Sequence, residues 1–192
     1  KKACRYYYER DFKIGYAGGG AAEILQSPDS EAPWDMAESA MGLFEITGEQ
    51  EWLVIAKNAV YLLSTWTVSY DYKFPIDCDM ARSNCHSTGS IFASSQNNHS
   101  APGLYILSGD FILKLNRATG DKRFAEMYKD LVHNTIQYVN TAYNPTIRNG
   151  SEGATSERVN LSDWEGRDEI GNTWPGSSVR SWETLELLTS LQ

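Results

Sequence analysis

The sequence lacks any apolar stretch of about 18 residues, the length that a membrane-spanning helix needs. It also lacks a cluster of lysine and arginine, and its formal net charge is -8. A chain with this charge repels the phosphate groups of nucleic acids. We therefore expect neither a membrane span nor a nucleic-acid partner.

Cysteine is scarce, with 3 residues in a chain of 192. So few cysteines cannot form a disulfide framework, and Cys4, Cys78 and Cys85 lack the paired short spacing of zinc ligands. His86 follows Cys85 and His99 comes later, but this spacing matches no established zinc pattern. We expect no metal and no other cofactor, while Cys78 and Cys85 could form one disulfide bond in an oxidising compartment.

Aromatic and hydrophobic residues, in contrast, are plentiful, at 12% and 41% of the chain. This hydrophobic content is enough to bury a core, and we expect residues 1–192 to form a single domain. Several tryptophan and tyrosine residues lie near glycine, proline and asparagine, outside the helical patterns. Such placement suits a surface that binds sugar rings, which need apolar faces and hydrogen-bonding tips. The alternative is that these rings pack between helices.

The sequence contains two copies of one turn motif. The segment Thr47–Trp52 reads Thr-Gly-Glu-Gln-Glu-Trp, and Thr119–Phe124 reads Thr-Gly-Asp-Lys-Arg-Phe. In each copy the glycine can adopt the left-handed conformation that ends a helix, and an acidic residue opens the next helix. The sequence therefore predicts two helix–turn–helix hairpins.

Apolar residues at helical spacing flank both turns and set the limits of the predicted hairpins. They predict hairpins over about residues 34–69 and 101–140, and a further helix over about 178–191. The stretches between them, residues 70–100 and 141–177, are longer than ordinary loops. Because antiparallel helices alternate in direction, the short turns should lie on one face and the long irregular loops on the other. The predicted fold class is all-α, with antiparallel helical hairpins.

The turn followed by an aromatic residue, the hairpin spacing and the segment Pro33–Ala40 resemble the six-hairpin glycosidase superfamily. The resemblance covers about residues 33–192 and implies an (α/α)6 toroid. This chain supplies two hairpins and part of a third, so the predicted toroid is incomplete. We expect a fragment, or a protein whose other hairpins come from missing sequence or a partner chain. Half a toroid exposes inner-helix surface, which could lead to self-association.

The resemblance implies a carbohydrate-active enzyme, a glycoside hydrolase of oligo- or polysaccharides that is periplasmic or secreted. Glycoside hydrolysis uses two carboxyl groups, one protonated and one ionised. Asp35 is the first candidate, because it follows Trp34 at the start of an inner helix. Glu38 lies on the same helical face, and Asp77 lies in the first long loop. The alternatives are ordinary acids at a helix N-terminus and a solvated loop charge.

A second group of residues is predicted to bind substrate or transfer protons. His99 begins the second inner helix, and its imidazole could act in proton transfer. The predicted substrate-binding residues are Trp34, Asn98, Trp164, Trp174 and Arg167. We expect the start of each inner helix, with Trp34 and His99, to lie on a common rim.

Two other functions remain open from the sequence. A polysaccharide lyase on the same scaffold would neutralise a uronate and abstract a proton, and His99 and Asn98 suit that chemistry. A non-catalytic helical repeat would bind glycan or protein across its loop face, through Trp34, Trp164 and Trp174. In that case the acidic residues would not matter.

Overall fold

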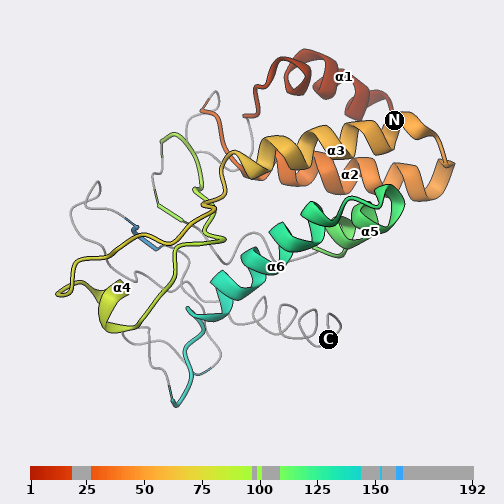
Figure 1. Cartoon of the computed structure of the whole chain (residues 1–192). Coiled ribbons are helices and arrows are strands. Elements are labelled where there is room, and N and C mark those ends of the chain that lie inside the picture. The colour runs from red at the N-terminus through yellow and green to blue at the C-terminus, as the bar shows by residue number, and fades with distance from the viewer. Residues whose placement is uncertain (19–26, 97–98, 101–108, 144–151, 153–158, 162–192) are drawn as a thin grey trace. The chain divides into compact units, whose positions relative to one another are not determined.

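The structure is a computed structural model, and it describes residues 1–18, 27–96, 99–100, 109–143, 152 and 159–161. Its helices are α1 (Lys2–Arg10), the 3-10 helix η1 (Phe12–Ile14), α2 (Glu31–Thr47), α3 (Gln50–Ser64), α4 (Asp79–Arg82), α5 (Asp110–Thr119) and α6 (Lys122–Ile136) (Figure 1). Extended segments within these ranges meet only in isolated bridges. The described part of the chain is therefore all-α, as predicted. None of its helices combines the length and the apolar character that crossing a membrane requires.

The chain divides into two compact units. The first consists of residues 1–66, 93–97 and 108–128, and the second of residues 67–92, 98–107 and 129–192. Helix α6 contributes its first half to one unit and its second half to the other. The predicted helix over 178–191 lies outside the described residues.

The core of the first unit forms where α2 packs against α3 (Figure 1). Trp52 is fully buried, and α3 buries further apolar residues at helical spacing: Ile55, Ala56, Ala59, Val60 and Leu63. Helix α2 faces them with Ala37, Ala40 and Met41. This one-sided pattern of burial is why the two sequences form helices that pair.

The two Thr-Gly turns have the same conformation. Gly48 and Gly120 follow α2 and α5 with φ of 68° and 71°, the left-handed region that the sequence predicts for both. The Thr47 hydroxyl donates to the carbonyl of Leu43 at 2.8 Å and accepts from the amide of Glu49 at 3.2 Å. Thr119 makes the equivalent two bonds at 2.7 and 3.2 Å. The threonine therefore bridges the last turn of one helix and the first residue of the connection.

Replacing either threonine by alanine should destabilise the first unit modestly. We expect Thr47→Ala and Thr119→Ala each to lower the free energy of unfolding by about 1 kcal/mol, because each removes a hydroxyl that both donates and accepts. The measurement is urea unfolding. Thr47→Ser, which keeps the hydroxyl, is the matched control and should remain close to wild type. Equal losses in the serine and alanine variants would contradict the role of the hydroxyl.

Helix α1 is held on the first unit by polar contacts. Arg5 forms an ion pair with Glu51 and lies over the Trp52 ring, with its guanidinium carbon 4.9 Å from the ring centroid. The amide of Asn58 donates to the hydroxyl of Tyr8 at 2.5 Å. The side chains of α1 are exposed or half-buried, and none is fully buried. The helix therefore depends on its charged partners more than on an apolar core.

The second unit has its own core, built largely from residues between the helices. Its buried members are Val68, Cys78, Met80, Tyr138, Val159 and Leu161. Cys78 and Cys85 are free thiols, so the disulfide bond that the sequence allowed is not formed. Burial, and to a lesser degree the neighbouring Cys78, raises the pKa of the Cys85 thiol to about 11. These cysteines therefore act here as small apolar side chains.

Candidate functional site

A cavity of about 840 Å³ lies in the first unit, beside α1, η1 and α2. Tyr7 and Phe12 line it from the first two elements, and Asp35, Ser39 and Gly42 from the third. These α2 residues share one face of the helix, because they are spaced by three to four positions. A Cβ atom added at Gly42 would meet no atom within 4 Å. Small residues on this face of α2 thus leave room for a ligand.

Asp35 lines this cavity, and its surroundings raise the pKa of its carboxyl group. Burial raises its pKa above the ordinary value, and the nearby carboxylates of Glu38 and Asp29 raise it further. The side chain nevertheless remains accessible to solvent. Asp29 is buried and accepts a hydrogen bond from the amide of Ala32 at 2.8 Å, at the beginning of α2. Asp35 therefore holds its proton to a higher pH than an ordinary aspartate does.

The other predicted site residues lie in different environments. Trp34 is only 4% exposed, and its ring packs edge-on against Phe111 at a centroid distance of 5.0 Å, so it offers no open face to a sugar. Asp77 is exposed and His99 is buried, and both belong to the second unit. The structure thus brings Asp35 and Glu38 together on α2. Four predicted residues lie outside the described part of the chain: Asn98, Trp164, Arg167 and Trp174.

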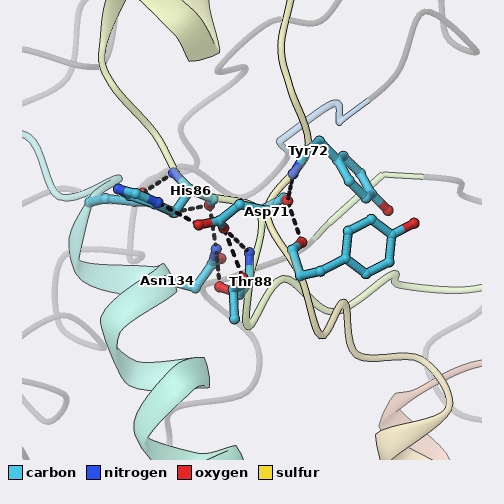
Figure 2. A network of polar contacts seen from close by, with 8 residues as sticks. Asp71, Tyr72, His86, Thr88 and Asn134 are labelled. Carbon is cyan, nitrogen blue, oxygen red and sulfur yellow. Dashed lines mark hydrogen bonds and ion pairs between the residues drawn. The ribbon is translucent and has the colours of Figure 1, made fainter.

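Figure 2 shows a second cluster of polar side chains, which lies entirely in the second unit. Nδ1 of His86 lies 2.7 Å from Oδ2 of Asp71, and Oδ1 of Asp71 accepts from the amide and the hydroxyl of Thr88 at 3.0 and 2.8 Å. The hydrogen bond with His86, followed by the two from Thr88, lowers the pKa of Asp71 to about 2. Asp71 is therefore ionised at any pH near neutrality.

Helix α6 holds the segment that carries His86. Asn134 donates its amide hydrogens to the carbonyls of His86 and Thr88 at 2.9 and 3.0 Å (Figure 2). Gln137 accepts from the amide of His86 at 2.8 Å and donates to its carbonyl at 2.7 Å. The amide and the carbonyl of His86 are thereby fixed to the end of α6 and to the residue that follows it. Sequence reasoning missed this cluster, and the only sequence signal was a polar Asn134 between the apolar positions of α6.

The Asp71 cluster should contribute stability that depends on pH. Because the pKa of Asp71 is depressed on folding, its contribution is present above the unfolded value of about 4 and is lost as pH falls through about 2. We expect Asp71→Ala to lower the unfolding midpoint at about pH 6, and the difference from wild type to shrink below about pH 3. Asp77→Ala, at an exposed aspartate of the same unit, is the control. A difference that stays constant with pH would show that the ionised carboxylate is not responsible.

The described residues thus contain two gatherings of ionisable groups with different chemistry. Asp35 lines the cavity with a raised pKa, and the charge of Glu38 acts on it from the next turn of α2, a pairing that suits acid–base catalysis. The Asp71 cluster combines a carboxylate with an exposed imidazole. No group of three or more histidine, cysteine, aspartate or glutamate side chains in the described ranges could hold a metal ion. Comparison with protein-family models, with curated proteins and with solved structures found no match to the chain.

Proposed function

We propose that this protein is a carbohydrate-active enzyme, a glycoside hydrolase whose acid is Asp35. The observation that carries the proposal is that Asp35 lines an open cavity while burial and two neighbouring carboxylates raise its pKa. Glycosidases need such a carboxyl group, because it must still hold a proton when the glycosidic oxygen leaves. A second carboxylate, kept ionised, must act from nearby.

Glu38 is the partner that we assign to Asp35. It lies one helical turn further along α2 and is half-buried, and its charge acts on the Asp35 carboxyl. Asp29 is less suitable, because it is buried and accepts a hydrogen bond at the start of α2. In the proposed reaction, Asp35 gives its proton to the leaving oxygen as the glycosidic bond breaks. Glu38 removes a proton from the attacking water or itself forms the bond to the sugar carbon.

We further infer that the helices belong to an incomplete α/α toroid of antiparallel hairpins. Support comes from the matching conformations of the two Thr-Gly turns, each of which ends one helix and starts the next. In such a fold the long loops bind the polysaccharide, and Asn98, Trp164, Trp174 and Arg167 remain our proposed contacts there. The location that suits this activity is the periplasm or the outside of the cell.

The type of product separates hydrolysis from the alternatives. The protein is incubated with starch, cellulose and xylan, and with the uronate polymers polygalacturonate and alginate. We expect new reducing ends from at least one polymer, without the ultraviolet absorbance of an unsaturated sugar. Appearance of that absorbance would favour the lyase and reject hydrolysis. Binding to a polymer without any cleavage would favour the non-catalytic repeat.

A further inference from the structure

The imidazole of His86 is held like a reactive group, in a unit of the chain separate from the Asp35 cavity. Its side chain is 64% exposed, and Nδ1 lies 2.7 Å from the Asp71 carboxylate. An ionised carboxylate can only accept a hydrogen bond, so Nδ1 must carry the hydrogen. In the neutral form of the ring the lone pair is then on Nε2, which makes no hydrogen bond within the described residues. In its neutral form the ring therefore presents the lone pair of Nε2 at the protein surface.

The surroundings fix the orientation of this ring. Asp71 cannot rotate freely, because its other oxygen accepts two hydrogen bonds from Thr88. The backbone of His86 cannot move freely either, because Asn134 of α6 and Gln137, which directly follows that helix, hold its amide and its carbonyl. A free imidazole in water has neither constraint. Fixed orientation and a fixed tautomer are what a carboxylate supplies to a catalytic histidine.

We propose that His86 is a nucleophilic site for acyl transfer, with Asp71 as its positioning residue. Cys85 precedes His86, but its thiol packs against the apolar core of the second unit, and burial raises its pKa to about 11, so it is not a ready nucleophile. Ser87 is engaged on both sides, since it donates to the carbonyl of Tyr70 and accepts from the amide of Tyr72. The attacking atom is therefore Nε2 itself. Histidine is among the side chains that form covalent intermediates in this way.

The chemistry of imidazole limits the substrate class. Nε2 forms a bond to the acyl carbon as the bond from that carbon to the leaving group breaks, and the leaving group departs with the electron pair. Water then adds to the acyl carbon and gives up one proton to the solvent, and the carbon–nitrogen bond breaks with its electron pair returning to Nε2, which leaves a carboxylic acid and the neutral imidazole. The leaving group must be no more basic than imidazole for the first step to proceed. Suitable substrates are aryl esters of electron-poor phenols and acyl phosphates, because thiolates and ordinary phenolates are more basic than imidazole.

Asp71 contributes by its charge and its position. While Nε2 is acylated the ring is positively charged, and the adjacent carboxylate stabilises this charge. The low pKa of Asp71 keeps the carboxylate ionised over the pH range in which the reaction would run. Asp71 contacts the ring of His86 and not the substrate. Removing its carboxylate should therefore change which ring nitrogen of His86 carries the hydrogen.

The test uses p-nitrophenyl acetate, an ester of an electron-poor phenol. It compares the wild-type protein with the variants His86→Ala and His133→Ala. The chain has 3 histidines, of which His99 is buried and His133 is exposed on α6, so His133 is the matched control. We expect His86→Ala to remove most of the nitrophenolate release, because it removes the attacking nitrogen, while His133→Ala leaves the release unchanged. Mass spectrometry of the quenched reaction should find the acetyl group on His86. Equal rates in the two alanine variants, or acetyl on His133 alone, would overturn the proposal.

A second measurement tests the role of Asp71 by the ¹⁵N NMR shifts of the His86 ring. In wild type, Nδ1 should carry the hydrogen and Nε2 should be unprotonated. In Asp71→Asn the amide can donate to Nδ1 while its carbonyl oxygen still accepts from Thr88, so the hydrogen should move to Nε2 and the reaction with the ester should be lost. Hydrogen on Nε2 in the wild type would overturn the proposal. Because neither readout uses a glycan, both are independent of the activity proposed for Asp35.

Discussion

Replacing Asp35 by asparagine is expected to lower the rate of glycan hydrolysis by about 10²-fold or more, the contribution of a positioned proton donor. The amide has nearly the same shape as the carboxyl group but cannot give a proton to the leaving oxygen. The loss should appear in kcat, because binding in the cavity does not require the proton. The measurement is reducing-end release from the polymer that the wild type cleaves best.

Two comparisons separate this effect from a loss of structure. Glu126→Gln removes an exposed carboxylate from α6, away from the cavity lining, and should leave the rate unchanged. The free energy of unfolding of Asp35→Asn should equal or slightly exceed that of wild type, because a carboxyl group with a raised pKa is costly to hold in its charged form. An Asp35→Asn variant that folds and cleaves at the wild-type rate would remove Asp35 from the mechanism.

Replacing Gly89 by alanine is expected to lower the free energy of unfolding by about 2–5 kcal/mol, from strain and overpacking together. Gly89 has a φ of 84°, and a Cβ atom there would lie 2.1 Å from the carbonyl oxygen of Asp130. That oxygen belongs to the backbone of α6 and cannot rotate away. The amide of Gly89 also donates to the carbonyl of Val68 at 2.8 Å, so the loop cannot shift without losing this bond.

Gly15→Ala is the matched control for this substitution. Gly15 has a similar φ of 78°, but a Cβ atom there would meet nothing within 4 Å. Gly15→Ala should lower the free energy of unfolding only by the cost of holding an alanine in the left-handed conformation, about 1–2 kcal/mol. Urea unfolding of both variants gives the comparison. Equal losses at the two positions would contradict the close approach of the Gly89 loop to α6.

The features that could be predicted from the sequence are those that depend only on residues a few positions apart in the chain. The Thr-Gly turns belong to this class, because the glycine, the threonine hydroxyl and the next amide are neighbours in the chain. The acidic character of the α2 N-terminus is also local, and Asp35 could be selected from it. Its raised pKa depends on burial and on Glu38 and Asp29, and sequence indicated only that Glu38 was near.

The features that sequence reasoning missed depend on residues far apart in the chain. Helix α1 is held by Glu51 and Asn58, and its own pattern gives little sign of them. The burial of Trp34 depends on Phe111, so the aromatic ring beside an acid suggested a sugar platform that the packing removes. The Asp71 cluster needs α6 to meet the segment around His86, which no local pattern could reveal.

The most direct test of the proposed enzyme is the pKa of the Asp35 carboxyl, followed by NMR through its side-chain carbon signal as pH is varied. The predicted result is a titration above the ordinary range of an aspartate, which moves to lower pH in Glu38→Gln because one of the nearby negative charges is gone. If the Asp35 carboxyl titrates at or below the ordinary range of an aspartate, and its pKa is the same in Glu38→Gln, then Asp35 does not hold its proton as proposed. That result would contradict the hydrolase mechanism.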